Sequence, residues 1–168
     1  MDNKLNNTPY SIGLLLTEGF ALMSYASLIE PLRAANLLAE NELYKVTDIA
    51  VQSSRVKSSS GAIIQTKDAT SDIFDLVLVI TGGDPKKLED TALFDTLRRL
   101  TRSKTIVGGI SGGPYLLAAA GLMRGYRMTV HWEHAPAMQE RWPELLLERS
   151  LYIFDRKRVT CAGGTAPL

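Results

Sequence analysis

The fold is decided by a stretch near the middle of the chain, Leu76–Asp84, which reads Leu-Val-Leu-Val-Ile-Thr-Gly-Gly-Asp. It begins with an unbroken apolar run, and this predicts a strand that is buried on both faces. Strands of this kind are typical of a parallel sheet that lies between two layers of helices. The glycines that follow predict a turn at the carboxyl end of the strand, where open α/β sheets bind their ligands.

Predicted strands and helices alternate on the amino-terminal side of this stretch. Pro31 lies inside a predicted helix and cannot donate a backbone hydrogen bond, so we expect a kink or a restart of the helix there. The expected elements are a strand over Tyr10–Leu16, a helix over about Ala21–Ala39, a strand over Tyr44–Val51, and a polar loop or short hairpin over 52–60 that leads into Ala62–Gln65.

The alternation continues towards the carboxyl terminus. It predicts one α/β domain over residues 1–168, with a doubly wound, mostly parallel sheet that carries helices on both faces. The expected elements are a helix over Leu88–Leu100, a strand over Thr105–Ile110, a helix over Tyr115–Ala120, a strand over Arg127–Val130, a helix over Glu133–Arg141, and a hairpin of Leu151–Phe154 with Val159–Ala162.

The composition of the chain excludes several classes of protein. Lys and Arg total 19 and Asp and Glu total 18, so a net charge of +1 gives the domain no general attraction to nucleic acid. Cys161 is the single cysteine, which excludes a disulfide framework and favours a structural role over a redox role. The apolar runs are too short to cross a bilayer and the first ten residues lack a signal-peptide core, so we expect a cytoplasmic protein without membrane contact.

Gly82 and Gly83 are the first candidate ligand-binding residues. Glycines let the backbone approach a ligand closely, and their N–H groups can face a carboxylate or a carbonyl oxygen. Short glycine turns are common, and a simple turn explains the same residues. Both interpretations stay open at this point.

The corner at Ser111 is the second candidate. The stretch 109–113 reads Gly-Ile-Ser-Gly-Gly and places a small polar residue between a predicted strand and a predicted helix. This is the arrangement of a nucleophile elbow, which raises a side chain over the sheet edge towards a helix N-terminus. A helix cap is the simpler interpretation of Ser111.

The third candidate is the segment Thr129–His134, in which a predicted strand delivers an imidazole, an indole and a carboxylate. His131 suits a general base beside the elbow, and Trp132 with Glu133 suits a cationic ligand. Core packing explains Trp132 equally well. His131 and His134 are spaced like metal ligands, but a third ligand is not evident, so we predict no metal site.

At these segments the chain resembles the class I glutamine amidotransferase-like superfamily, which includes PfpI-type peptidases. More specifically, it resembles the amino-terminal domain of AraC-family regulators of the amidotransferase-like kind. The residues that carry the resemblance are Glu30–Asn36, Leu76–Val79 with Gly82 and Gly83, Gly109–Gly112, Leu117–Leu122, Thr129–Glu133 and Cys161–Pro167.

This resemblance implies a flavodoxin-like fold and a homodimer. It also implies an AraC-type helix-turn-helix domain beyond residue 168, through which the protein would contact DNA. Regulators of this group often sense amino acids or quaternary amines, such as arginine, betaine or carnitine. We therefore expect the natural chain to continue past the Gly-Gly-Thr-Ala-Pro-Leu sequence that ends at Leu168.

The chain departs from its catalytic relatives at the elbow. By the resemblance, Ser111 takes the position of their cysteine nucleophile, and Gly112 replaces the histidine that follows the cysteine in the peptidases. Ser24 takes the position where other members place a glutamate that contacts the thiol. A serine hydroxyl needs an oriented base, and His131 without an evident acid makes an incomplete triad. We therefore expect no catalysis.

The favoured hypothesis is a ligand-sensing domain that binds a small amine or an amino-acid-like effector without a cofactor. Backbone N–H groups of Gly83 and Gly112 would hold a carboxylate, and Trp132 with Glu133 would meet a cationic group. The alternative is a PfpI-like hydrolase or amidotransferase-like enzyme that uses Ser111 and His131, and a third hypothesis is a dimerisation module with a vestigial pocket. The expected pocket comprises Met23, Ser24, Gly82, Gly83, Ser111, Gly112, His131, Trp132 and Glu133.

Overall fold

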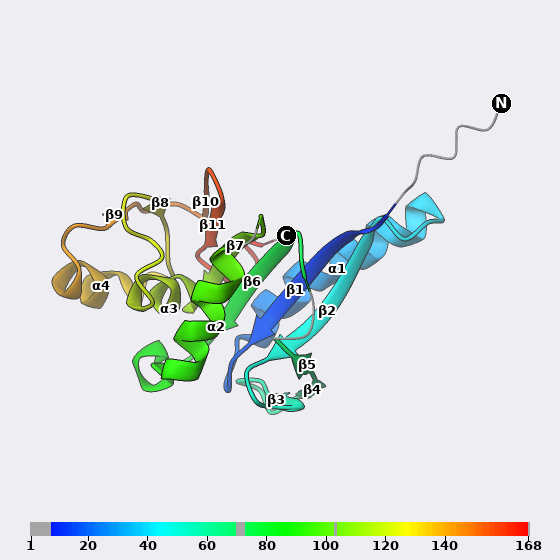
Figure 1. Cartoon of the computed structure of the whole chain (residues 1–168), viewed down its shortest axis with the longest axis horizontal. Coiled ribbons are helices and arrows are strands. Elements are labelled where there is room, and N and C mark those ends of the chain that lie inside the picture. The colour runs from blue at the N-terminus through cyan, green and yellow to red at the C-terminus, as the bar shows by residue number, and fades with distance from the viewer. Residues whose placement is uncertain (1–7, 70–72, 103, 168) are drawn as a thin grey trace.

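The stretch Leu76–Asp84 supplies the middle strand of the sheet (Figure 1). The computed structural model describes residues 8–69, 73–102 and 104–167. Its main sheet has seven strands in the order β10-β11-β7-β6-β1-β2-β5, and the neighbours are parallel except β10, which pairs antiparallel with β11. The strands are β1 (Tyr10–Leu16), β2 (Tyr44–Ala50), β5 (Lys67–Asp68), β6 (Leu76–Thr81), β7 (Ile106–Ser111), β10 (Tyr152–Asp155) and β11 (Arg158–Cys161).

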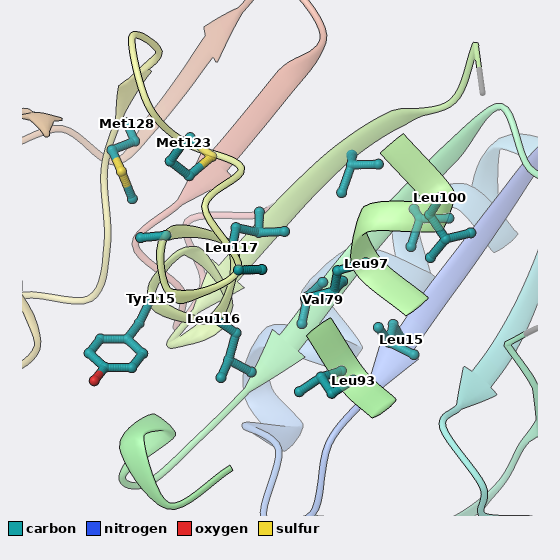
Figure 2. Close-up of a cluster of buried hydrophobic side chains, with 14 of the residues drawn as sticks. Leu15, Val79, Leu93, Leu97, Leu100, Tyr115, Leu116, Leu117, Met123 and Met128 are labelled. Atoms are coloured by element: carbon teal, nitrogen blue, oxygen red, sulfur yellow. The ribbon is translucent and has the colours of Figure 1, made fainter. Parts of the chain in front are cut away.

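Apolar side chains of the central strands point alternately to two buried clusters, one on each face of the sheet. Leu15 and Val79 pack against α2 (Thr91–Arg102) and α3 (Gly113–Ala119), as Figure 2 shows. Leu14 and Ile80 belong to the cluster on the opposite face, which is covered by α1 (Leu22–Ala39). Because burial on both faces requires apolar residues at every position, this arrangement explains the unbroken apolar run of β6.

Shorter elements extend the layers at two ends of the molecule (Figure 1). The polar segment after β2 forms the expected hairpin, in which β3 is antiparallel to β4. At the other end, β8 pairs in parallel with β9, and α4 lies beside them. The bounds of these elements are β3 (Arg55–Lys57), β4 (Ile63–Gln65), η1 (Pro85–Leu88), β8 (Arg127–Met128), α4 (Ala135–Arg141) and β9 (Leu146–Leu147).

Several predicted elements differ from the observed ones. Of the kink or restart expected at Pro31, the restart is wrong, because α1 is one continuous helix from Leu22 to Ala39 with Pro31 inside it. The helix expected over Leu88–Leu100 begins only at Thr91, after a separate 3₁₀ turn that Asp84 caps by accepting a hydrogen bond from the Lys86 N–H. The first seven residues and Leu168 lie outside the described residues.

Two further predicted elements are shorter than expected. The strand predicted over Arg127–Val130 has two residues, because the Thr129 N–H donates to Thr160 Oγ1 at 2.9 Å instead of joining a ladder. The helix expected over Glu133–Arg141 begins at Ala135, where Pro136 has the fixed φ that suits a first turn. Among the described helices, none is both long and apolar enough for a membrane span.

Gly109 allows β7 and α3 to approach closely. A Cβ atom at Gly109 would lie 2.4 Å from the Pro114 nitrogen and 2.5 Å from the Gly113 carbonyl carbon. Contacts this short with backbone atoms cannot be relieved by a side-chain rotation, so the strand and the helix must separate. The tight corner at Ser111 therefore depends on a residue without a side chain two positions earlier.

We predict that Gly109→Ala lowers the free energy of unfolding by about 3 kcal/mol, because it overpacks the junction between β7 and α3. The matched control is Gly121→Ala, where φ is +79° but a Cβ would meet nothing within 4 Å. Backbone strain alone should cost that variant about 1 kcal/mol. Urea denaturation of both variants measures the difference, and equal losses would contradict the steric explanation.

Candidate functional site

Ser111 forms a sharp corner between β7 and α3. Its φ is 60°, a left-handed conformation that costs a residue other than glycine about 1–2 kcal/mol. The backbone around it holds this conformation, because the Gly112 N–H donates to the Thr81 carbonyl at 3.1 Å and the His131 N–H donates to the Ser111 carbonyl at 3.2 Å. The strand-to-helix elbow predicted from the sequence is therefore present.

A carboxyl-terminal segment packs directly on this corner. A Cβ at Gly163 would lie 2.7 Å from Ser111 Cβ and 3.1 Å from Ser111 Oγ. The next residue, Gly164, donates its N–H to the fully buried Ser24 Oγ at 2.9 Å. Ser24 therefore anchors the segment that covers Ser111 to α1, which is a structural role beside the elbow.

The Ser111 hydroxyl lies at the corner without a base bonded to it among the described residues. Ser111 Oγ forms no hydrogen bond with any residue that the structure describes. The His131 imidazole lies instead beside Glu133, with 3.4 Å between His131 Nδ1 and Glu133 Oε2. A hydroxyl without a bonded base stays protonated and is a weak nucleophile.

A cleft of about 420 Å³ opens beside the elbow. One wall is the loop Gly83–Lys86 after β6, and the other is formed by Tyr115, Glu133, His134 and Ala137. His134 connects the cleft to the corner, because a Cβ at Gly112 would lie only 3.4 Å from His134 Nε2. The cleft therefore lies at the carboxyl end of β6, where this class of sheet places its ligands.

A charged network fixes the two walls relative to each other. Arg141 of α4 donates hydrogen bonds to Glu89 and to the Tyr115 hydroxyl, and the Tyr115 hydroxyl donates to Glu89 Oε1 at 2.8 Å. The Arg141 guanidinium also stacks on Trp142, 4.5 Å from the ring centroid. These bonds hold the pKa of Glu89 below its usual range, the hydrogen bond from Arg141 being the largest cause. Figure 2 shows the Tyr115 hydroxyl turned away from the apolar cluster.

The cleft presents groups of both charge signs. Asp84 and Glu133 contribute carboxylates from opposite walls, and Lys86 contributes an ammonium group. Gly83 lines the cleft, and its N–H has no backbone partner among the described residues. Carboxylates attract a cationic group, while an ammonium and an N–H group attract an anionic one. The arrangement suits a small zwitterion.

His134 is a neutral group in the middle of these charges. Burial lowers its pKa below the ordinary value, and the neighbouring His131 lowers the pKa further. Asp84 and Glu133 act in the opposite direction and raise it, but with smaller effect. At neutral pH the imidazole can therefore serve as a hydrogen-bond donor or acceptor for a bound molecule without adding positive charge.

The structure brings only part of the predicted pocket into this cleft. Gly83 and Glu133 line it, and Gly112 borders it through His134. The Gly112 N–H is not available for a carboxylate, because it already donates to Thr81.

Other predicted residues lie elsewhere. Gly82 packs against the turn before α1, where its Cβ would lie 2.4 Å from the Gly19 carbonyl oxygen. Met23 is 61% exposed on α1, and Trp132 is 74% exposed and lines a second cleft. Core packing, the alternative interpretation of Trp132, is therefore wrong.

Cys161 is buried in the core, and burial raises the pKa of its thiol, as a structural role requires.

Sequence reasoning missed several residues of the cleft. Asp84 follows the glycine pair and precedes a proline, a combination that indicates a capped turn at a ligand-binding strand end. The spacing of His134 from His131 indicates only a metal ligand. No group of metal-binding side chains occurs in the part of the chain that the structure describes. Its approach to Gly112 depends on the start of α4, which sequence spacing does not give. Lys86 and Tyr115 carry no comparable sequence signal.

Comparison with known proteins identifies the family. Residues 10–168 match the DJ-1/PfpI family. The chain belongs to this family. Its structure superposes on that of an AraC family transcriptional regulator from Pseudomonas putida with a TM-score of 0.84 and 25% identity, over 95% of this chain and 86% of the other. The flavodoxin-like, class I glutamine amidotransferase-like fold expected from the sequence is confirmed.

Several curated relatives of this DJ-1/PfpI chain are transcriptional regulators. The HTH-type transcriptional regulator GlxA of Rhizobium meliloti is 48% identical over 160 residues, which cover 94% of this chain and 49% of GlxA. The HTH-type transcriptional regulator GbdR of Pseudomonas aeruginosa is 39% identical over 166 residues, which cover 97% of this chain and 45% of GbdR. The chain therefore spans about half the length of the curated relatives that it matches.

The strained corner gives a prediction for stability. Ser111→Gly should raise the free energy of unfolding by about 0.5–1 kcal/mol, because glycine adopts this φ without steric cost and loses only part of that gain to unfolded-chain entropy. Ser111→Ala keeps the strain and removes Oγ, so it should change stability by less than about 0.5 kcal/mol. Chemical denaturation tests both, and a loss of several kcal/mol in Ser111→Ala would reveal a structural hydrogen bond of Oγ.

The environment of His134 gives a second prediction. NMR titration should show a His134 pKa below 6.5, the ordinary value. His131→Gln should raise this pKa by removing a like charge, and Asp84→Asn should lower it by removing a carboxylate. In the wild-type protein the lowered pKa means that His134 binds a proton more tightly in the unfolded chain than in the folded one. The contribution of neutral His134 to stability is therefore complete above pH 6.5 and is lost as the pH falls below it. A His134 pKa above 6.5 would contradict the described burial.

Proposed function

We propose that this domain senses a small zwitterionic effector for a transcriptional regulator and binds it without covalent chemistry. The effector belongs to the class of amino acids and betaines, which carry a cationic amine and a carboxylate a few atoms apart. One observation carries the proposal. The cleft beside Ser111 combines two carboxylates with Lys86 and a free glycine N–H, whereas Ser111 Oγ has no hydrogen-bond partner among the described residues.

The cleft orients such a ligand. The amine group lies between Asp84 and Glu133, and the carboxylate is bound by the Gly83 N–H and Lys86. His134 supplies a neutral hydrogen-bonding group near the elbow. A volume of about 420 Å³ is within the range of small-molecule sites. Because a zwitterion needs both signs of charge at a fixed separation, the site discriminates against simple anions and simple amines.

Regulation requires a second domain in this proposal. The curated relatives are HTH-type regulators about twice as long as the region matched here, and a net charge of +1 makes this domain a poor partner for DNA by itself. A helix-turn-helix domain beyond residue 168 would bind DNA, and a homodimer would match a two-fold operator. The effector would act by binding one arrangement of the domains more tightly than the other.

Isothermal titration calorimetry with a panel of amino acids, betaines and simple amines tests the proposal. At least one zwitterion should bind saturably. Asp84→Asn and Glu133→Gln should each lower the affinity for that zwitterion about ten-fold, because each removes one charged partner. Asparagine keeps an oxygen that can cap η1, so the first variant should fold normally. Asp95→Asn is the matched control, because Asp95 lies outside the cleft and pairs with Arg98 on an exposed face of α2. Failure of the whole panel would refute the proposal.

The left-handed corner favours one second candidate function, a hydrolase that uses Ser111 as its nucleophile. Ser111→Ala separates the two functions. In a sensor, effector affinity survives this substitution and the wild-type protein leaves the effector unchanged over long incubation. In a hydrolase, turnover of the bound compound is measurable and disappears in the variant, while the compound still binds.

A further inference from the structure

A second cleft, larger than the effector cleft, is separate from it. It has a volume of about 790 Å³ and is lined by parts of 129–139 and 147–151 together with Ala162. It shares no lining residue with the smaller cleft that contains Gly83 and His134. Nothing in the proposed zwitterion site therefore accounts for it.

The walls of this larger cleft are mostly apolar. Trp132 and Leu151 are 74% and 66% exposed, and Pro136, Leu147 and Val130 form further wall surface. Large apolar side chains that stay accessible in a concave surface are typical of ligand sites and are otherwise unfavourable in water. The body of the occupant must therefore be apolar.

Some polar groups of the cleft are hydrogen-bonded within the protein, and others have no partner among the described residues. Glu148 is neutralised by Arg127, which donates two hydrogen bonds to it at 2.5 Å and 2.9 Å. Ser150 donates from its Oγ to the Tyr152 carbonyl, at 2.9 Å. The Arg149 guanidinium and the Gln139 carboxamide have no partner among the residues that the structure describes. One uncompensated positive charge therefore remains at an apolar cleft.

We propose that this cleft binds an amphipathic carboxylate, an aliphatic or aromatic monoacid. Its apolar chain lies against Trp132, Pro136 and Leu151, and its carboxylate pairs with Arg149 and accepts a hydrogen bond from Gln139. Guanidinium and carboxylate form charge-assisted bonds that favour an acid over a neutral analogue of the same shape. The excess of apolar wall over charged groups distinguishes this ligand from the compact zwitterion of the smaller cleft.

Intrinsic fluorescence of the chain provides the assay, with octanoate as the probe and octanamide as its neutral analogue. The chain has two tryptophans, and Trp142 lines neither cleft. Octanoate should change the emission saturably, and Trp132→Phe should abolish the change. Octanamide should bind at least ten-fold more weakly than octanoate. Arg149→Gln should lower the affinity for octanoate at least ten-fold and leave the affinity for octanamide unchanged. The matched control is Arg124→Gln, which should change neither affinity, because Arg124 is exposed and its nearest acidic partner is Glu144, with 3.9 Å between Nη2 and Oε1.

Three outcomes would overturn the proposal: no saturable response to octanoate, equal affinity for acid and amide, or an Arg149→Gln variant that binds octanoate normally. A cleft that is instead covered by a second copy of the chain would show concentration-dependent Trp132 emission without any added acid, and Leu151→Asp would yield a smaller species in analytical ultracentrifugation. That result would also overturn it. Asp84→Asn should not change octanoate binding, because Asp84 does not line this cleft. The two proposals can therefore be refuted independently.

Discussion

The left-handed conformation of Ser111 is the constraint on which the site depends. A φ of 60° at a serine is unfavourable, so the surrounding chain must enforce it. It is enforced on three sides, by the hydrogen bond from Gly112 to Thr81 in β6, by the hydrogen bond from His131 to Ser111 itself, and by the contact with Gly163. Segments that are distant in sequence are thereby fixed around one residue.

This constraint bears on how a family that contains enzymes could supply the binding domain proposed above. The elbow is held by backbone hydrogen bonds, none of which involves the Ser111 hydroxyl, and by the contact with Gly163. Reactivity needs more, namely a base that is bonded to the nucleophile and is oriented by a third group. In this chain His131 lies against Glu133 and not against Ser111 Oγ. The chain therefore keeps the backbone corner without a base bonded to Ser111 Oγ among the described residues.

The sequence predicts the fold better than it predicts the site. The run Leu76–Ile80 and its alternation with helical segments lead to the doubly wound sheet, because burial on both faces leaves a pattern that can be read locally. The site depends on distant contacts that leave no local pattern. Ser24 holds Gly164 across 140 positions of sequence, and Trp132 lines another cleft than its neighbour Glu133. Adjacent residues of an irregular segment point in directions that only the folded chain determines.

The two clefts differ in charge but meet at the same corner. Ala162 lines the larger cleft, and the next residue, Gly163, packs on Ser111. Val130 lines the larger cleft as well, and the following His131 binds the Ser111 carbonyl. On the other side, His134 joins the smaller cleft to Gly112. A molecule in either cleft would therefore touch a segment that holds the strained corner. A ligand that displaced either segment would change the contacts that hold this corner, and this shared contact gives a physical route by which the two proposed sites could be coupled.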